Sequence, residues 1–179
     1  MNYSEKEKIA VIGLGYVGLP LAVEFSKKYD VIGFDIDKTR ISELKNNSDR
    51  TNELSSEDFQ YLDNFKLTSD ENEISGANYY IVTVPTPIDI NNKPDLRHII
   101  SASELIGRHL NKNDIVIYES TVFPGCTEEV CVPILEKISL LKYNLDFFCA
   151  YSPERINPGD KKHKLSNITK VVSGSTDKV

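Results

Sequence analysis

The chain has 179 residues, of which 40% are hydrophobic and 27% charged, and its formal net charge is −6. This length suits one domain that buries roughly 70% of the surface its unfolded chain exposes. The Lys and Arg residues are scattered along an acidic chain, which excludes a basic nucleic-acid platform and predicts no nucleic-acid partner.

Strand-like and helix-like patterns alternate along the sequence. Short β-branched or aromatic runs predict strands at residues 8–13, 30–35, 65–70, 79–84, 114–120, 146–152 and 170–174. Helical spacing predicts helices at 16–29, 37–47, 96–110 and 125–138, a helix-containing polar excursion at 48–64, and a loop at 85–94. This alternation predicts an α/β fold, a doubly wound and mainly parallel Rossmann-like sheet with helices on both faces.

The stretch GLGYVG follows the first predicted strand and opens the first predicted helix. It places Gly13, Gly15 and Gly18 in the spacing G-x-G-x-x-G, which allows a tight turn, close approach of a pyrophosphate and tight packing of helix on strand. The start of the helix presents backbone N–H groups to the phosphates. The loop therefore predicts a dinucleotide-binding domain, although the same spacing alone also occurs in packing turns.

An acidic residue stands at the end of the second predicted strand. Asp35 lies 22 residues after Gly13, where a carboxylate accepts hydrogen bonds from the adenosine ribose and repels a 2′-phosphate. NAD is therefore the expected cofactor. Arg40 follows five residues later and can offset that repulsion, which leaves NADP open at this point. A role for Asp35 in capping the next helix is compatible with ribose binding.

The remaining reactive side chains indicate a reducing compartment and no metal. Cys126, Cys131 and Cys149 are odd in number and lack a disulfide framework spacing, and the first residues do not form an export signal. We expect reduced thiols, a cytoplasmic protein and no membrane partner. The three histidines show no metal-ligand spacing. Cys126 opens a predicted helix, where a thiol pKa is lowered, but a small residue filling the first turn is the simpler interpretation.

Three proline-containing loops follow later predicted strands, namely VPTP at 84–87, ESTVFPG at 119–125 and SPERINPG at 152–159. Together with GLGYVGLP and FDID, in this order and at these intervals, they resemble the UDP-glucose/GDP-mannose dehydrogenase family of nucleotide-sugar 6-dehydrogenases. STVFPGCTEE and SPERINPGDK are most similar to the branch that acts on UDP-N-acetylhexosamines. The resemblance implies one NAD-binding domain over residues 1–179, and an enzyme that oxidises C6 of a UDP-sugar to the acid with two NAD per turnover.

The resemblance also implies roles for individual residues. Besides the three glycines, it implies that the cofactor is lined by Tyr16, Val17, Asp35, Arg40, Thr86 and Thr121. It implies that Glu154 lies between the nicotinamide end and the sugar, that Thr121 and Glu154 hold or activate a water, and that Arg155 lies toward the substrate. A carboxylate on a strand-end loop suits general-base chemistry when partial burial raises its pKa. The plain alternative is a solvated Glu154–Arg155 ion pair on a turn.

Family members form a thiohemiacetal and a thioester on a cysteine, assisted by a lysine, in a segment that corresponds to residues beyond 179. The resemblance therefore implies that this chain alone turns over no sugar, and that the full-length protein is a homodimer. UDP-glucose stays open as the sugar. Two other functions also stay open: a β-hydroxyacid dehydrogenase of the 6-phosphogluconate type, which VPTP and SPERINPG disfavour, and a non-catalytic module that senses NAD(H).

Overall fold

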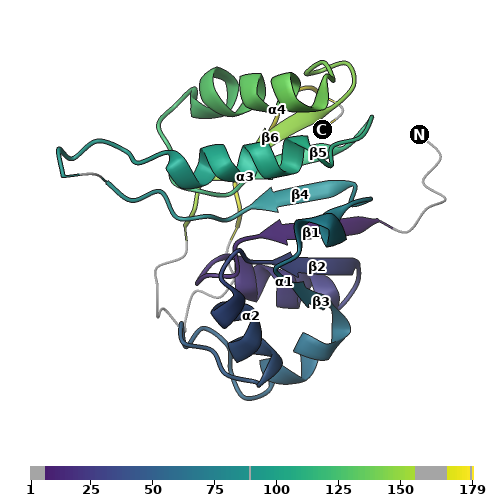
Figure 1. Cartoon of the computed structure of the whole chain (residues 1–179), viewed down its shortest axis with the longest axis vertical. Helices are drawn as coiled ribbons and strands as arrows, with labels where there is room; N and C mark the ends of the chain where they lie inside the picture. Colours follow the sequence, from purple (N-terminus) through teal and green to yellow (C-terminus); the bar gives the residue numbers. More distant parts are fainter. Residues whose placement is uncertain (1–6, 89, 156–168, 178) are drawn as a thin grey trace.

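A seven-stranded sheet runs through the part of the chain described by the computed structural model, which comprises residues 7–88, 90–155, 169–177 and 179 (Figure 1). The strand order is β3-β2-β1-β4-β5-β6-β7, and every neighbouring pair is parallel except β6 and β7. The strands are β1 (Lys8–Ile12), β2 (Asp30–Phe34), β3 (Lys66–Thr68), β4 (Tyr79–Val82), β5 (Ile115–Tyr118), β6 (Phe148–Tyr151) and β7 (Ser173–Gly174). The predicted doubly wound, mainly parallel sheet is confirmed.

Helices cover both faces of this sheet. The helices are α1 (Gly18–Ser26), α2 (Lys38–Lys45), α3 (Arg97–Gly107) and α4 (Val132–Ser139), with 3₁₀ segments η1 (Asp58–Asn64) and η2 (Glu71–Ile74) and a π-helical turn η3 (Thr127–Cys131). One apolar cluster lies between the sheet and α1, α2 and η1, and the other between the sheet and α3 and α4 (Figure 1). Because both faces are covered, β1 is apolar at almost every position rather than at alternate ones.

The register of the sheet brings the ends of the central strands to one edge. Ile12 at the end of β1 pairs with Phe34 of β2 and with Val82 of β4. Val82 in turn pairs with Tyr118 at the end of β5. The segments that follow these strands therefore begin side by side, at the edge where parallel α/β sheets bind ligands.

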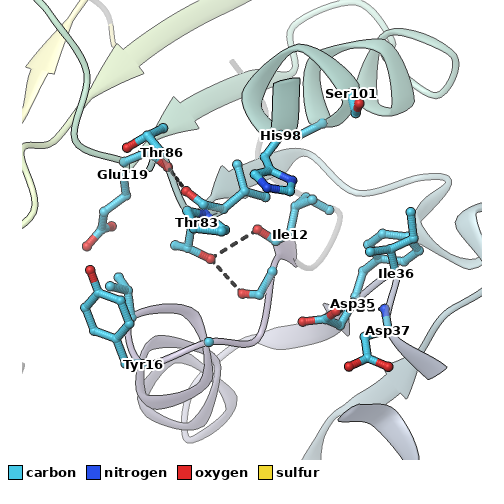
Figure 2. Close-up of a pocket in the computed structure, with 18 of the residues that line it drawn as sticks. Ile12, Tyr16, Asp35, Ile36, Asp37, Thr83, Thr86, His98, Ser101 and Glu119 are labelled. Atoms are coloured by element: carbon cyan, nitrogen blue, oxygen red, sulfur yellow. Dashed lines mark hydrogen bonds between the residues drawn. The ribbon is translucent and has the colours of Figure 1, made fainter. Parts of the chain in front are cut away.

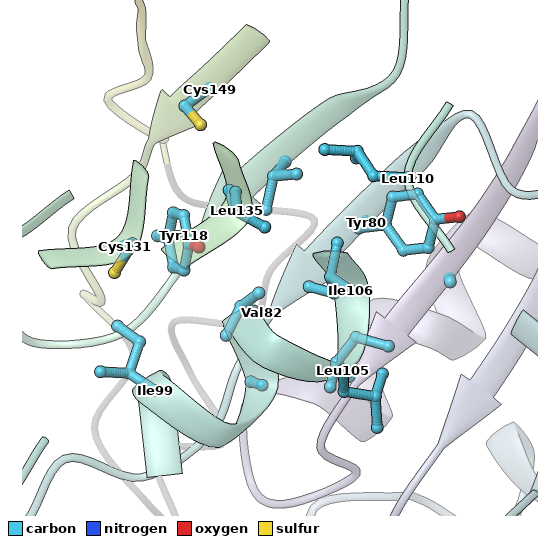
Figure 3. Packing of buried hydrophobic residues seen from close by; sticks show 14 of the residues in the cluster. Tyr80, Val82, Ile99, Leu105, Ile106, Leu110, Tyr118, Cys131, Leu135 and Cys149 are labelled. Atoms are coloured by element: carbon cyan, nitrogen blue, oxygen red, sulfur yellow. The ribbon is translucent and has the colours of Figure 1, made fainter. Parts of the chain in front are cut away.

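The α3–α4 side of the core, whose apolar packing is drawn in Figure 3, also contains two buried hydroxyl groups, those of Ser103 and Tyr118. Ser103, which shares the apolar face of α3, is fully buried, and its hydroxyl lies 2.7 Å from the hydroxyl of Tyr118. It also donates to the carbonyl of Ile99 at 2.8 Å. Buried hydroxyls without such partners would cost stability. Gly107 lets α3 approach α4 closely, since a β-carbon there would lie 2.9 Å from Cβ of Ile138.

The helix predicted at 125–138 is divided in the structure. Its first part is the π-helical turn η3, and α4 begins at Val132 with Pro133 in its first turn. Proline has no N–H to bond the carbonyl four residues earlier, so the chain widens locally before the regular helix begins. Cys126 and Cys131, five residues apart around this turn, are both fully buried.

The strand predicted at 170–174 is shorter than expected and runs the other way. Only Ser173 and Gly174 pair with β6, in antiparallel orientation. Val171 and Val172 are 55% and 59% exposed. Their β-branched side chains suggested a buried strand, but they do not pack into the core. Within the described residues, none of the helices combines the length and hydrophobicity that crossing a membrane requires.

Candidate functional site

A cavity of about 500 Å³ lies at the edge where β1, β2, β4 and β5 end. Its walls come from the glycine loop, the end of β2, the segment after β4, helix α3, the segment after β5, and Glu154. Asp35 and Glu119 lie at opposite ends of the cavity (Figure 2). The volume falls in the range usual for small-molecule and cofactor sites.

The glycine loop is built so tightly that side chains would disrupt it. Gly13 has φ +98°, a conformation that favours glycine, and its N–H donates to the carbonyl of Phe34 at 2.8 Å. At Gly18, a β-carbon would overlap the carbonyl oxygen of Gly13 and the hydroxyl of Thr83. That hydroxyl donates to the Gly13 carbonyl at 2.7 Å. Thr83 therefore ties the loop to the end of β4.

The middle of the same loop is open. A β-carbon at Gly15 would meet nothing within 4 Å, and Gly15, Tyr16 and Val17 line the cavity. Val17 precedes helix α1 and no side chain caps the helix at this residue. The loop thus leaves an uncrowded backbone surface at the start of α1, which fits the pyrophosphate of a dinucleotide.

Asp35 is held firmly at the end of β2. One carboxylate oxygen accepts from the N–H of Leu14 at 2.8 Å, and the other accepts from the N–H of Asp37 at 2.9 Å. Asp37, rather than Asp35, caps helix α2 by accepting from the N–H of Thr39. Asp35 therefore joins the glycine loop to β2, and each oxygen retains a lone pair for a ribose hydroxyl.

Arg40 does not lie where the family resemblance led us to expect. Its side chain is only 2% exposed and does not line the cavity. The guanidinium donates to the carbonyl of Leu14 and to the carboxylate of Asp49, each at 2.8 Å. It therefore braces the back of the glycine loop. The guanidinium that lines the cavity belongs to Arg50, for which no sequence pattern predicted a role.

The other end of the cavity gathers Thr86, Thr121 and Glu154, which follow β4, β5 and β6 in the chain. The hydroxyl of Thr86 donates to the carbonyl of Thr121, which joins the segments after β4 and β5. Tyr16 faces this end from the glycine loop. Its pKa is raised above the ordinary value, first by burial and then by the negative charges of Glu154 and Glu53, so Glu154 lies close to the loop.

A buried acid in this region was not among the predicted site residues. Glu119 lines the cavity with only 5% of its surface exposed, and Figure 2 shows its carboxylate pointing toward the hydroxyl of Tyr16. It forms an ion pair with Lys170, which precedes β7. The sequence placed Glu119 at a strand end, but nothing in it indicated a partner 51 positions later.

Two further predictions concern residues around this end. Arg155 is exposed, does not line the cavity, and donates to the carbonyl of Thr169 at 2.9 Å. The rest of the predicted SPERINPG loop, residues 156–159, lies outside the described part of the chain. Cys126 is buried, and burial raises the pKa of its thiol, in keeping with the interpretation as a packed residue.

Helix α3 supplies the remaining wall of the cavity. The sequence did not predict that this helix would line the site. His98, Ser101, Ala102 and Leu105 line it together with Ile36 after β2. His98 on α3 and Ile36 after β2 both line the cavity on the side of Asp35 (Figure 2). The four α3 residues recur at i, i+3, i+4 and i+7, which is the spacing of any single helix face, so periodicity alone could not mark them as cavity residues.

Comparison with known proteins agrees with this geometry. A family model described as the UDP-glucose/GDP-mannose dehydrogenase family, NAD binding domain, matches residues 7–179. UDP-N-acetyl-D-glucosamine 6-dehydrogenase from Salmonella typhi is 57% identical over 98% of this chain and 41% of its own length. The Pseudomonas aeruginosa protein of the same name is 56% identical over 96% of this chain and 41% of its own length.

Solved structures give the same result at the level of the fold. A UDP-D-ManNAc dehydrogenase from Pyrococcus horikoshii superposes with a TM-score of 0.84 and 30% identity, over 96% of this chain and 42% of that one. The chain thus spans about two fifths of the length of the relatives it matches.

Proposed function

Because this chain belongs to the UDP-glucose/GDP-mannose dehydrogenase family and matches its NAD-binding domain, we propose that it is the cofactor-binding part of a nucleotide-sugar 6-dehydrogenase. The enzyme would oxidise the C6 hydroxyl of a UDP-sugar to a carboxylate, and residues 1–179 would form one NAD-binding domain of it. Family membership removes the 6-phosphogluconate-type alternative raised by the sequence.

The residues present fit NAD. The open backbone at Gly15 and the start of α1 would receive the pyrophosphate, and Asp35 would accept from the adenosine ribose. The part of the cavity lined by Ile36 and His98 would hold the adenine. When bound, NAD accepts the hydride in each of the two oxidation steps.

The acidic end of the cavity would then meet the nicotinamide and the sugar. Glu154 and Thr121 lie there, and in this proposal they position the water whose oxygen enters the acid. Glu154 can take a proton from that water as a general base. Glu119, which is paired with Lys170, is a second carboxylate that lines the same cavity.

The observation that carries this proposal is the 57% identity with a UDP-N-acetyl-D-glucosamine 6-dehydrogenase over 98% of the chain. It supports a UDP-N-acetylhexosamine over UDP-glucose as the substrate. The three buried, unpaired cysteines are compatible with a reducing cytoplasm. We include in the proposal that the full-length protein is a cytoplasmic homodimer that supplies sugar acids for polysaccharide synthesis.

The test is an activity assay on a protein of the relatives' full length that contains this chain. We expect two NADH for each UDP-N-acetylglucosamine consumed, with slower turnover of UDP-N-acetylgalactosamine and UDP-glucose, read by NADH absorbance and by the uronic acid formed. The chain of 179 residues alone should bind NAD and produce no NADH. No oxidation of any UDP-sugar by the full-length protein, or turnover by the short chain, would contradict the proposal.

A further inference from the structure

Arg50 places a positive charge on the wall of the cavity beside the ribose-binding acid. It lines the cavity together with Asp35 and Asp37, and 48% of its side chain is exposed. A guanidinium in this position, next to the end of the second strand, matches the geometry by which dinucleotide-binding sheets accept a 2′-phosphate. Arginine also binds phosphate in a bidentate manner. The cavity thus contains a group suited to NADP.

A network behind the wall fixes the loop that carries Arg50. The buried carboxylate of Asp49 accepts from the N–H groups of Thr51, Glu53 and Leu54, at 3.0, 2.9 and 3.2 Å. Its charge is matched by Arg40 at 2.8 Å, and both side chains are only 2% exposed. The backbone next to Arg50 is therefore held by a buried ion pair and by hydrogen bonds to the carboxylate of Asp49.

Two carboxylates already contact the guanidinium of Arg50. One of its nitrogens lies 2.5 Å from Asp37 Oδ2, and its Nε lies 3.2 Å from Glu43 Oε2. The hydrogen bond to Asp37 raises the pKa of Arg50, and the charges of Glu43 and Asp35 act in the same direction. Three acids therefore surround one arginine at this end of the cavity.

We propose that Asp37 and Glu43 withhold Arg50 from the 2′-phosphate of NADP, so that discrimination in favour of NAD depends on this ion-pair cluster as well as on Asp35. Arg40 cannot take that role because its side chain is buried behind the loop and does not line the cavity. Asp35 is clamped by two backbone N–H groups, so it cannot turn away from a phosphate. The inference rests on NAD binding and is independent of which sugar is oxidised.

The test replaces Asp37 and measures cofactor affinity by calorimetric titration of NAD and NADP. Asp37→Asn removes the charge but keeps an oxygen that can cap α2. We expect NADP affinity to rise roughly 5- to 20-fold, since a phosphate gains a charged partner, while NAD affinity changes less than about 3-fold. Adding Arg50→Gln should abolish the gain for NADP. Higher salt should also reduce it.

Asp70→Asn is the matched control, because Asp70 accepts from the N–H two residues on, as Asp37 does, but caps η2 away from the cavity. It should leave both affinities unchanged. Glu43→Gln provides a second route to releasing Arg50, should Asp37→Asn fold poorly. An unchanged NADP affinity in both releasing variants would overturn the inference. So would a gain that persists with Arg50→Gln, or a loss of NAD affinity above about 10-fold in Arg50→Gln alone.

Discussion

Replacing Gly18 by alanine is expected to weaken NAD binding by at least about 100-fold and to destabilise the fold by roughly 1–3 kcal/mol. The added β-carbon would overlap the carbonyl oxygen of Gly13 and the hydroxyl of Thr83. Both belong to the hydrogen bond that ties the glycine loop to β4. The loop must shift, and its backbone then no longer fits the pyrophosphate. Calorimetric titration and urea unfolding measure the two effects.

Gly15→Ala provides the matched control within the same loop. A β-carbon at Gly15 has no neighbour within 4 Å, so the free energy of unfolding should stay within about 1 kcal/mol of the unmodified chain. NAD affinity should nevertheless fall roughly 10- to 100-fold, because the side chain would occupy the surface that the pyrophosphate approaches. Equal destabilisation by the two substitutions, or normal NAD binding by Gly18→Ala, would show that the loop does not work as described.

Replacing Glu154 by glutamine is expected to lower kcat about 10²- to 10⁴-fold in a full-length protein containing this chain. Glutamine preserves the size of the side chain and much of its hydrogen bonding, but it cannot take a proton from water. Glu154 lies at the end of the cavity opposite Asp35, close to Tyr16. NAD affinity should therefore change by less than about 1 kcal/mol, the scale of one neutral hydrogen bond.

The comparison variant for Glu154 is Arg155→Gln. Arg155 is its exposed neighbour, does not line the cavity, and bonds a backbone carbonyl. A general-base role predicts a loss of kcat with Glu154→Gln that far exceeds the loss with Arg155→Gln. If Glu154→Gln retains kcat within about threefold, or weakens NAD binding as strongly as it slows turnover, the residue acts as part of a structural turn.

The fold followed from sequence because its strands are buried on both faces. Continuous apolar runs such as KIAVI predicted parallel strands, and the glycine spacing predicted where β1 gives way to α1. The register at Ile12 and Val82 explains why polar residues at strand ends converge. Where apolar side chains are exposed, as at Val171 and Val172, the same reasoning gave too long a strand.

Long-range charge pairing could not be predicted. Arg40 and Arg50 both lie near Asp35 in sequence, and only the fold of the segment around Asp49 decides which of them is buried and which lines the cavity. The pairing of Glu119 with Lys170 is likewise a product of chain topology. Spacing identified the glycine loop and the acid of β2 because those features are local. The cavity wall from α3 was missed because the spacing of its residues is that of any helix face, whether the face meets the core or a ligand.

The most direct test of the account is a calorimetric titration of NAD into this chain and into its Asp35→Ala variant. We expect one NAD bound per chain. Loss of the charge-assisted hydrogen bonds to the ribose, roughly 1.5–3 kcal/mol, should weaken binding about 10- to 150-fold in the variant. The far-ultraviolet spectrum of the variant should remain that of the folded chain. An absence of saturable NAD binding, or an affinity unaffected by Asp35→Ala, would contradict the placement of the cofactor at this edge of the sheet.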